Sequence, residues 1–226
     1  MSRNDELIKK DIVDSLFWDD RVDASDIAVE VEDGVVNLAG AVPTYLAREA
    51  AFDDALVLDG VTQVRNRIDV RPVVTDGPPT DERIRDDLAM IIQRDPNLEA
   101  AEINVAVNAG RVTLEGTVDA HWKKFHVEER IAHTRGVLAI DNLLAVVPRR
   151  DIGDQAIGEV ITAALDRHAL VNANDITVSV EDGIVTLTGN VPDRLSRQAA
   201  YEAALYTEGV VEIRDELVLS PIGSSV

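Results

Sequence analysis

The sequence predicts an α+β fold of three tandem αββαβ modules, each a three-stranded mixed sheet with two helices packed on one face. Three observations lead to this architecture. Gly34, Gly110 and Gly183 stand 76 and 73 residues apart, and in each copy further glycines follow at spacings of 6 and then 20 residues. Alternating apolar residues surround the first glycine of every copy. Apolar residues spaced by four precede each hairpin, and a chain of 226 residues has room for three such copies.

Each copy begins with a predicted amphipathic helix followed by a hairpin. Apolar residues four apart form one stripe on a helix. Alternation on both sides of the first glycine is typical of two half-buried strands. The helical stripes are Ile8-Ile12-Leu16, Ile84-Leu88-Ile92 and Ile157-Ile161-Leu165. The strand alternations are Ile27-Val29-Val31 with Val36-Leu38, Ile103-Val105-Val107 with Val112-Leu114, and Ile176-Val178-Val180 with Val185-Leu187.

The turn of each hairpin contains the first glycine, which is Gly34, Gly110 or Gly183. A two-residue type I′ turn would place Ala109 at a positive φ, which a Cβ atom disfavours. A type I turn that closes with glycine in the left-handed region, as a G1 bulge, suits all three copies. We therefore expect a three-residue loop.

The later glycines predict the second half of each module. The second glycine is expected to end the second strand, where a close neighbour leaves no room for a side chain. A helix of about 15 residues follows, and the third glycine is expected at its C-cap, where the left-handed conformation is needed. The second glycines are Gly40, Gly116 and Gly189, and the third are Gly60, Gly136 and Gly209. The helices are expected to open at Pro43-Thr44, Asp119 and Pro192-Asp193.

The third strand of each copy contains one polar residue among apolar neighbours. The strands are marked by Val64/Ile68/Val70, Ile140/Leu144/Val146 and Ile213/Leu217/Leu219. Asn66, Asn142 and Asp215 share the inward phase with these residues. A polar side chain in such a place needs hydrogen-bond partners. Because it recurs in all three copies, we expect it to anchor adjacent backbone.

The copies define three domains with boundaries 1–72, 78–148 and 151–221. Residues 71–79, RPVVTDGPP, predict a stiff linker because proline and glycine oppose a helix. Residues 148–151, PRRD, predict a shorter hinge, and the tail 221–226 is expected to fray. Each copy is small enough that packing between copies is expected to add stability.

The repeated unit resembles the BON domain family (bacterial OsmY and nodulation domain). The resemblance rests on ITVSVEDGIVTLTGNVPDRLSRQAA with GVVEIRDELVL, and on IAVEVEDGVVNLAGAVPTYLAREAA with GVTQVRNRIDV. The middle copy, INVAVNAGRVTLEGTVDAHWKKF with GVLAIDNLLAV, is similar but departs in its turn and helix start. The resemblance implies no shared catalytic residues. It also implies a link to envelope stress, often in the periplasm, with phospholipid or protein surfaces as binding targets.

Composition and charge narrow the possible functions. The formal charge of −20, from 42 acidic against 22 basic residues, repels phosphate backbones, so nucleic-acid binding is disfavoured. The chain has no cysteine, which excludes disulfides and thiolate metal sites. The N-terminal residues lack the pattern of a signal peptide and no apolar run could span a bilayer, so we expect a cytoplasmic protein. A mature form whose signal has been removed would instead be periplasmic.

The middle copy is the unusual one. Residues 78–150 carry a net charge of −2, whereas each flanking copy carries −9. Its predicted second helix contains an aromatic and basic cluster that could form an anion or headgroup patch. The candidate binding residues of this helix are Trp122, Lys123, Lys124, Phe125, His126 and Arg130. Trp122 alternatively belongs to the core, because it aligns with Leu46 and Leu195.

A second candidate surface lies on the third strand of the middle copy. Its outward phase carries Leu143, Ala145 and Val147, where the first copy has charged residues. Helices are expected to cover one sheet face only, so this apolar stripe needs a covering partner. A sister domain, a protein partner or a lipid could supply it. Leu143 and Val147 therefore join the candidate binding residues.

No catalytic, cofactor or metal site is expected. The sequence has neither a G-x-S-x-G elbow nor a phosphate-binding glycine motif. The histidines of the middle helix lack the spacing of a metal site, and we interpret them as solvated. We therefore expect a non-catalytic binding or scaffold protein that engages a protein partner or a second copy of itself, with a link to osmotic or envelope stress. The alternative is binding of phospholipid or another small amphiphile through the middle domain.

Overall fold

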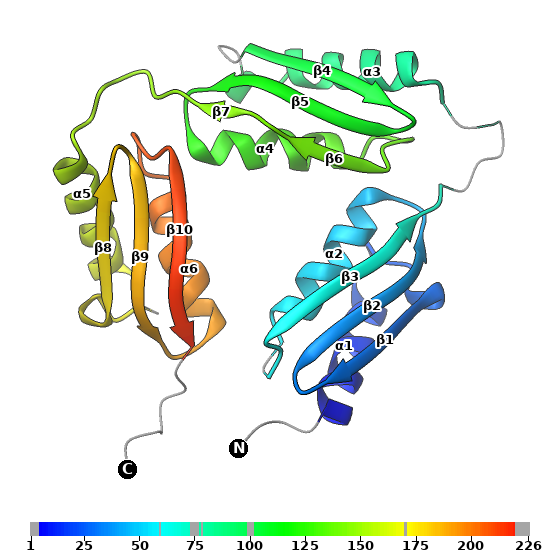
Figure 1. Ribbon diagram of the computed structural model, residues 1–226, viewed down its shortest axis with the longest axis horizontal. Helices are drawn as coiled ribbons and strands as arrows, with labels where there is room; N and C mark the ends of the chain where they lie inside the picture. Colours follow the sequence, from blue (N-terminus) through cyan, green and yellow to red (C-terminus); the bar gives the residue numbers. More distant parts are fainter. Residues whose placement is uncertain are drawn as a thin grey trace. The chain divides into compact units, whose positions relative to one another are not determined.

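The computed structural model describes residues 5–58, 60–72, 77, 79–98, 102–169 and 171–219. Within these ranges the chain forms three modules with the predicted αββαβ order (Figure 1), and each module is described by itself. Part of the predicted linker, residues 73–76 and 78, lies outside the described residues, as does the predicted tail 221–226.

The first module contains two helices and a three-stranded sheet. Strands β1 and β2 are antiparallel and β2 and β3 are parallel, so the sheet is mixed and has the order β1-β2-β3. Its elements are α1 (Asp5–Trp18), the 3₁₀ turn Ala24–Asp26, β1 (Ile27–Glu32), β2 (Val35–Val42), α2 (Tyr45–Leu56) and β3 (Gln63–Val70).

The second module has the same order, but its third strand is in two pieces. The sheet has the order β4-β5-β6, and β7 pairs with β5 in parallel beyond the break. Its elements are α3 (Asp81–Gln93), the 3₁₀ turn Pro96–Leu98, β4 (Glu102–Asn108), β5 (Arg111–Val118), α4 (His121–Ala132), β6 (Ala139–Asn142) and β7 (Ala145–Val146).

The third module repeats the first. Strands β8 and β9 are antiparallel and β9 and β10 are parallel, in the order β10-β9-β8. Its elements are α5 (Asp154–Arg167), the 3₁₀ turn Ala173–Asp175, β8 (Ile176–Glu181), β9 (Ile184–Val191), α6 (Arg194–Leu205) and β10 (Glu212–Leu219).

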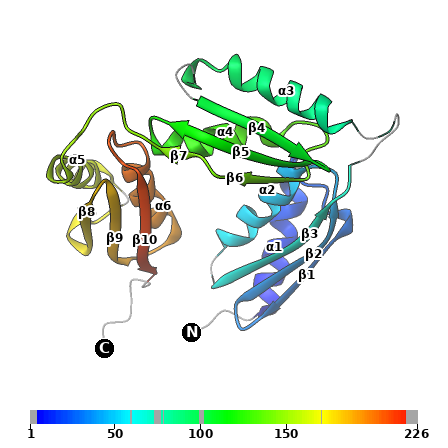
Figure 2. The same ribbon diagram turned by 45° about the horizontal axis from the view of Figure 1, so that its top comes forward.

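Both helices of a module lie on the same face of its sheet (Figures 1 and 2). The core lies between these two layers. The predicted helical stripes supply it: Ile12, Leu88 and Ile161 are all 0% exposed, and only Ile92 at the end of the second stripe is partly exposed. Burying each such side chain stabilises the fold by about 1.5–3 kcal/mol. The other face of each sheet is left uncovered by the module's own helices.

The hairpin turns differ from the expected three-residue loop. Strand register pairs Glu32 with Val35 and Glu181 with Ile184, which leaves a two-residue turn in both outer modules. Both residues of each turn have positive φ, as in a type I′ turn, so the predicted G1 bulge is wrong. The φ values are 51° and 76° at Asp33-Gly34, 48° and 75° at Ala109-Gly110, and 51° and 74° at Asp182-Gly183.

An aspartate in the first turn of each module's first helix explains this conformation. Its carboxylate accepts hydrogen bonds from both N–H groups of the turn, so the helix holds the hairpin in the left-handed conformation. Such a carboxylate also interacts favourably with the positive end of its helix. The pairs are Asp5 with Asp33 and Gly34 at 2.9 and 3.1 Å, Asp81 with Ala109 and Gly110 at 2.7 and 3.0 Å, and Asp154 with Asp182 and Gly183 at 3.0 and 2.9 Å. We call this arrangement the helix–turn clasp.

The second glycine of each copy marks a close approach, as predicted, but does not end the strand. A Cβ atom on Gly40 would lie 1.9 Å from the carbonyl oxygen of Asp26, and Gly116 and Gly189 are equally crowded. Strand β2 nevertheless continues to Val42. The prediction failed because glycine at a φ of 133° still keeps its hydrogen bonds within the sheet.

The second helices are shorter than expected, at 12 residues each. Thr44 and Asp193 cap the outer two through their side chains, whereas α4 begins at His121, two residues after Asp119. The third glycines are not helix C-caps. Val57 and Tyr206 occupy those positions in the outer modules, and the glycines follow in a turn with φ of about 90° that leads into the third strand. They are Gly60, Gly136 and Gly209.

The polar residue of each third strand anchors backbone, as predicted for the two asparagines. The amide of Asn66 donates to the carbonyl oxygen of Arg48 in α2, and its own oxygen accepts from the N–H of Ile68. Asn142 makes the equivalent bonds to the Lys124 carbonyl and the Leu144 N–H. Asp215 keeps the bond to strand backbone but reaches the helix through the Arg197 side chain, at 2.7 Å. This residue therefore ties each second helix to its strand.

Candidate functional site

The candidate residues form two separate surfaces of the second module. We call Trp122, Lys123, Lys124, Phe125, His126 and Arg130 the α4 cluster, and Leu143, Ala145 and Val147 the strand stripe. The helix lies on the covered face of the sheet (Figure 1), whereas the outward phase of β6 and β7 lies on the opposite face. The structure thus does not bring the predicted binding residues together in one site.

The aromatic side chains of the α4 cluster lie at the surface of the helix. Val127 and Ile131 supply the core side of α4, each 0% exposed, whereas Phe125 is 46% exposed. Trp122 is partly exposed and contacts the His126 ring edge to face at 5.6 Å. The interpretation of Trp122 as a core residue is therefore wrong. The alignment misled because its counterpart Leu195 in the third module is itself 65% exposed.

Carboxylates neutralise much of the basic character of the α4 cluster. Lys123 Nζ lies 2.7 Å from Asp119, and Arg149 Nε lies 2.6 Å from the second oxygen of the same carboxylate. Burial opposes ionisation of Asp119, but the hydrogen bond from Lys123 and the nearby positive charges outweigh it and lower its pKa. His126 Nε2 lies 2.8 Å from the buried carboxylate of Asp95. An incoming anion would have to compete with these pairs.

The strand stripe is an exposed apolar surface on an open sheet face. Leu143 is 62% exposed and Val147 is 56% exposed, whereas Leu144, in the opposite phase, is 2% exposed and belongs to the core. The Val147 N–H donates to the Val118 carbonyl at 2.8 Å, which continues the parallel pairing past β7. Ala145 lies in β7, whereas Leu143 lies at the break between β6 and β7 and Val147 directly follows β7, and the side chains of all three are exposed.

The stripe is specific to the second module. At the same register of β3 the first module has Arg67, Asp69 and Arg71, of which the last two form an ion pair at 3.0 Å. The fold therefore does not require apolar residues at these positions. An exposed apolar surface that the fold does not require is typical of a binding site.

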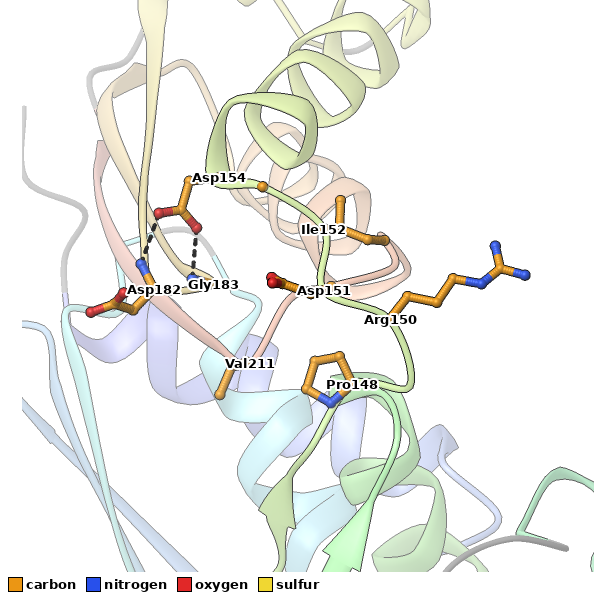
Figure 3. Close-up of a pocket in the computed structure, with 10 residues that line it drawn as sticks. Pro148, Arg150, Asp151, Ile152, Asp154, Asp182, Gly183 and Val211 are labelled. Carbon is orange, nitrogen blue, oxygen red and sulfur yellow. Dashed lines mark hydrogen bonds between the residues drawn. The ribbon is translucent and has the colours of Figure 1, made fainter.

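Sequence reasoning missed a hollow at the turn end of the third module (Figure 3). It has a volume of about 460 Å³. The residues that line it are Pro148, Arg150, Asp151, Ile152, Gly153, Asp154, Asp182, Gly183, Gly209 and Val211. The Asp154 carboxylate is directed at the turn N–H groups and is engaged by them. The second module has a smaller hollow of about 310 Å³ at the same end. The recurrence of Asp5, Asp81 and Asp154 in the glycine register was the available signal.

Metal-binding clusters and membrane-spanning helices are both absent from the residues that the structure describes. Within those ranges no group of three or more histidine, aspartate or glutamate side chains is placed to hold a metal ion. In the same part of the chain, each helix is too short or too polar to cross a lipid bilayer.

Comparison with known proteins identifies the repeated unit. The BON domain matches residues 4–72, 80–148 and 153–221. Osmotically-inducible protein Y of Escherichia coli (strain K12) is 25% identical over 142 residues, which cover 62% of this chain and 71% of that protein.

Two solved structures of CdsD, a structural protein of the type III secretion system of Chlamydia trachomatis, are each 14% identical to the chain. The match with the first structure covers 96% of this chain and 94% of the CdsD chain, with a TM-score of 0.27. The match with the second structure, of the C-terminal domain of CdsD, covers 97% of this chain and 100% of that domain's chain, with a TM-score of 0.26. From the three family matches and the threefold αββαβ architecture, the chain belongs to the BON domain family.

Proposed function

We propose that this chain is a non-catalytic binding or scaffold protein that engages a protein partner through the strand stripe of its second BON domain. The observation that carries the proposal is the exposure of Leu143 and Val147 on a sheet face that the module's own helices leave open. The charged residues at the same register of the first module support a role in recognition, since the shared fold works without the stripe.

The gain from covering the stripe is large enough to favour association. Full burial of a leucine or valine side chain is worth about 1.5–3 kcal/mol. Leu143 and Val147 are 62% and 56% exposed, so a partner that covers what remains exposed gains about 2–3.5 kcal/mol. A flat sheet face also suits a protein surface better than a small molecule, which needs a concave site. Three tandem domains, with the boundaries 1–72, 78–148 and 151–221 that we propose, would add weak contacts through effective concentration.

The name of the E. coli relative, osmotically-inducible protein Y, supports a role in osmotic stress, and a link to the envelope stays a prediction. A binding protein without catalytic machinery fits such a role if it holds other proteins or copies of itself together. Location in the cytoplasm, with the periplasm as the alternative for a mature form, stays a prediction.

The test compares binding by the whole chain and by a variant that copies the first module. Leu143→Arg with Val147→Arg installs the residues found at Arg67 and Arg71, so the sheet is expected to tolerate both changes. Val218→Arg, at a 57% exposed position on the outer face of β10, is the matched control. Pull-down from a native lysate is followed by binding measurements with the purified candidate partner.

We expect the double variant to weaken that binding at least tenfold, while Val218→Arg leaves it unchanged. Equal binding by all three proteins would refute the proposal. Sedimentation velocity of the same set tests the second copy as the partner, because loss of a dimer in the double variant alone would identify self-association through the stripe.

Phospholipid binding through the α4 cluster is the second candidate. It is favoured by Phe125, 46% exposed, and by Lys123, whose Nζ lies 5.7 Å from the centroid of the Trp122 ring. The ion pairs of Lys123 and His126 weaken it. Flotation of the whole chain with phosphatidylglycerol vesicles at low salt tests whether the protein binds phospholipid. Retention that is lost in Lys124→Glu with Phe125→Ser supports the cluster, and absence of retention removes the lipid candidate.

A further inference from the structure

Two exposed aromatic side chains stand at the end of the first helix. Phe17 is 73% exposed and Trp18 is 80% exposed. Their rings meet edge to face with centroids 5.4 Å apart. An adjacent pair of large aromatic side chains at such exposure is unusual on a protein surface that binds nothing.

The fold does not require this aromatic pair. Aligning Ile8 with its counterparts in the other two helical stripes places Gln93 and Arg94 at the equivalent positions of the second module. In the third module the equivalents are Asp166 and Arg167. The helices of the second and third modules bury their stripes without an aromatic pair at this point, apart from the partly exposed Ile92 of the second module, so the pair has no part in the common core.

Carboxylates follow the pair in the chain and also lie on α2, beside the loop that follows the pair. Asp19, Asp20 and Asp23 follow it directly in the chain, and Arg21 contacts both Asp19 and Asp54, which places the end of α2 beside this loop. Asp53 precedes Asp54 on the same helix. Desolvation raises the pKa values of Asp53 and Asp54, as expected where acidic groups crowd together at a partly dry surface. Arg21 contacts two of these five aspartates, Asp19 and Asp54, and its single positive charge leaves the local charge negative.

We propose that this aromatic–acidic corner of the first domain, Phe17 and Trp18 with the neighbouring aspartates, binds a basic amphipathic peptide segment of a protein partner. The apolar side chains of the peptide cover the two rings, and its lysine or arginine side chains pair with the carboxylates. A cation can also lie over the indole face of Trp18, which is the preferred aromatic partner of a positive charge. Charge complementarity selects this occupant, because an acidic peptide or an anionic bilayer is repelled by the same aspartates.

The corner is distinct from the strand stripe. It lies on another domain and on a helix rather than an open sheet face. Loss of binding at one surface is therefore expected to leave binding at the other unchanged, and Leu143→Arg with Val147→Arg provides that control.

The test uses tryptophan fluorescence of the whole chain. The sequence has two tryptophans, so Trp122→Phe leaves Trp18 as the single reporter. The probe is a 14-residue synthetic peptide of leucine and lysine with leucine at helical spacing. Control peptides have glutamate in place of lysine, or serine in place of leucine. We expect the Leu/Lys peptide to shift the Trp18 emission to the blue, and both control peptides to bind at least tenfold more weakly.

Variants then separate the corner from general attraction to an acidic protein. Phe17→Ser in the Trp122→Phe background is expected to weaken binding of the Leu/Lys peptide at least tenfold. Leu195→Ser, at another highly exposed apolar position, is the matched control and should have no effect. Calorimetry with Phe17→Ser and Trp18→Ser together provides a second measurement that needs no fluorophore.

Three outcomes would overturn the inference. The first is peptide binding that leaves the Trp18 emission unmoved. The second is binding unaffected by Phe17→Ser. The third is an equal blue shift with vesicles of phosphatidylglycerol, which would assign the corner to a lipid surface instead.

Discussion

The helix–turn clasp makes a quantitative prediction for the third domain. Asp154→Ala removes two hydrogen bonds, of 3.0 and 2.9 Å, from the N–H groups of Asp182 and Gly183. Hydrogen bonds to a charged group contribute about 1.5–3 kcal/mol each, and solvent exposure at Asp182 reduces this to about 1 kcal/mol per bond. The favourable interaction with the helix end adds about 0.5 kcal/mol. We expect a loss of about 2.5 kcal/mol, which is a large share of the stability of a small domain.

Hydrogen exchange followed by NMR measures this loss where it occurs. A loss of about 2.5 kcal/mol in the free energy of local opening raises the exchange rates of the Asp182 and Gly183 amides about 70-fold. Asp166→Ala changes the same charge on an exposed residue of the same helix and should leave both rates unchanged. If the two amides exchange equally slowly in Asp154→Ala and in the unmodified protein, the clasp does not hold the turn.

Three further changes test other parts of the fold. Gly189→Ala would place a Cβ atom 2.0 Å from a carbonyl oxygen, so we expect a loss of more than about 3 kcal/mol in urea unfolding. Gly153→Ala meets nothing within 4 Å and changes only the N-cap of α5, so it should cost less than about 1 kcal/mol. Ala109→Asn places a residue that tolerates positive φ in the type I′ turn and should raise the stability of the second domain by about 1 kcal/mol; a lower urea midpoint would contradict the turn assignment. Hydrogen bonds from Ser196 lower the pKa of Asp193, so its cap stabilises α6 above about pH 4 and is lost as the pH falls through the folded pKa. Asp193→Asn should therefore reduce the difference in thermal stability between pH 7 and pH 3, and an unchanged difference would exclude the cap as its source.

The order of helices and strands could be predicted because it depends on patterns that repeat over short stretches of sequence. The glycine register and the four-residue helical stripes determine the element order, and each depends on residues close in sequence. The hairpin turn could not be predicted in the same way. Its conformation depends on a carboxylate 28 residues earlier, and the left-handed φ of Ala109 is unfavourable when that hydrogen bond is left out.

Of the candidate surfaces, the sequence predicted the strand stripe but not the contacts of the α4 cluster or the aromatic pair Phe17 and Trp18. Comparison of the three copies was sufficient to find Leu143 and Val147, since strand phase alone determines which side chains point outward. The contact between His126 of the α4 cluster and Asp95 could not be predicted, because Asp95 lies 31 residues earlier in the chain. Phe17 and Trp18 lie where a helical stripe ends, and periodicity says nothing about residues beyond the stripe.

The helix–turn clasp also bears on how such a protein can diversify. In each copy the clasp, the crowded strand glycine and the polar anchor of the third strand all act on backbone, and every one of them is satisfied inside its own copy. The outer sheet face and the distal end of the first helix carry none of these constraints. Duplication of the unit therefore yields copies that stay foldable while their free faces specialise, as the arginines of one copy and the aliphatic residues of the next already illustrate.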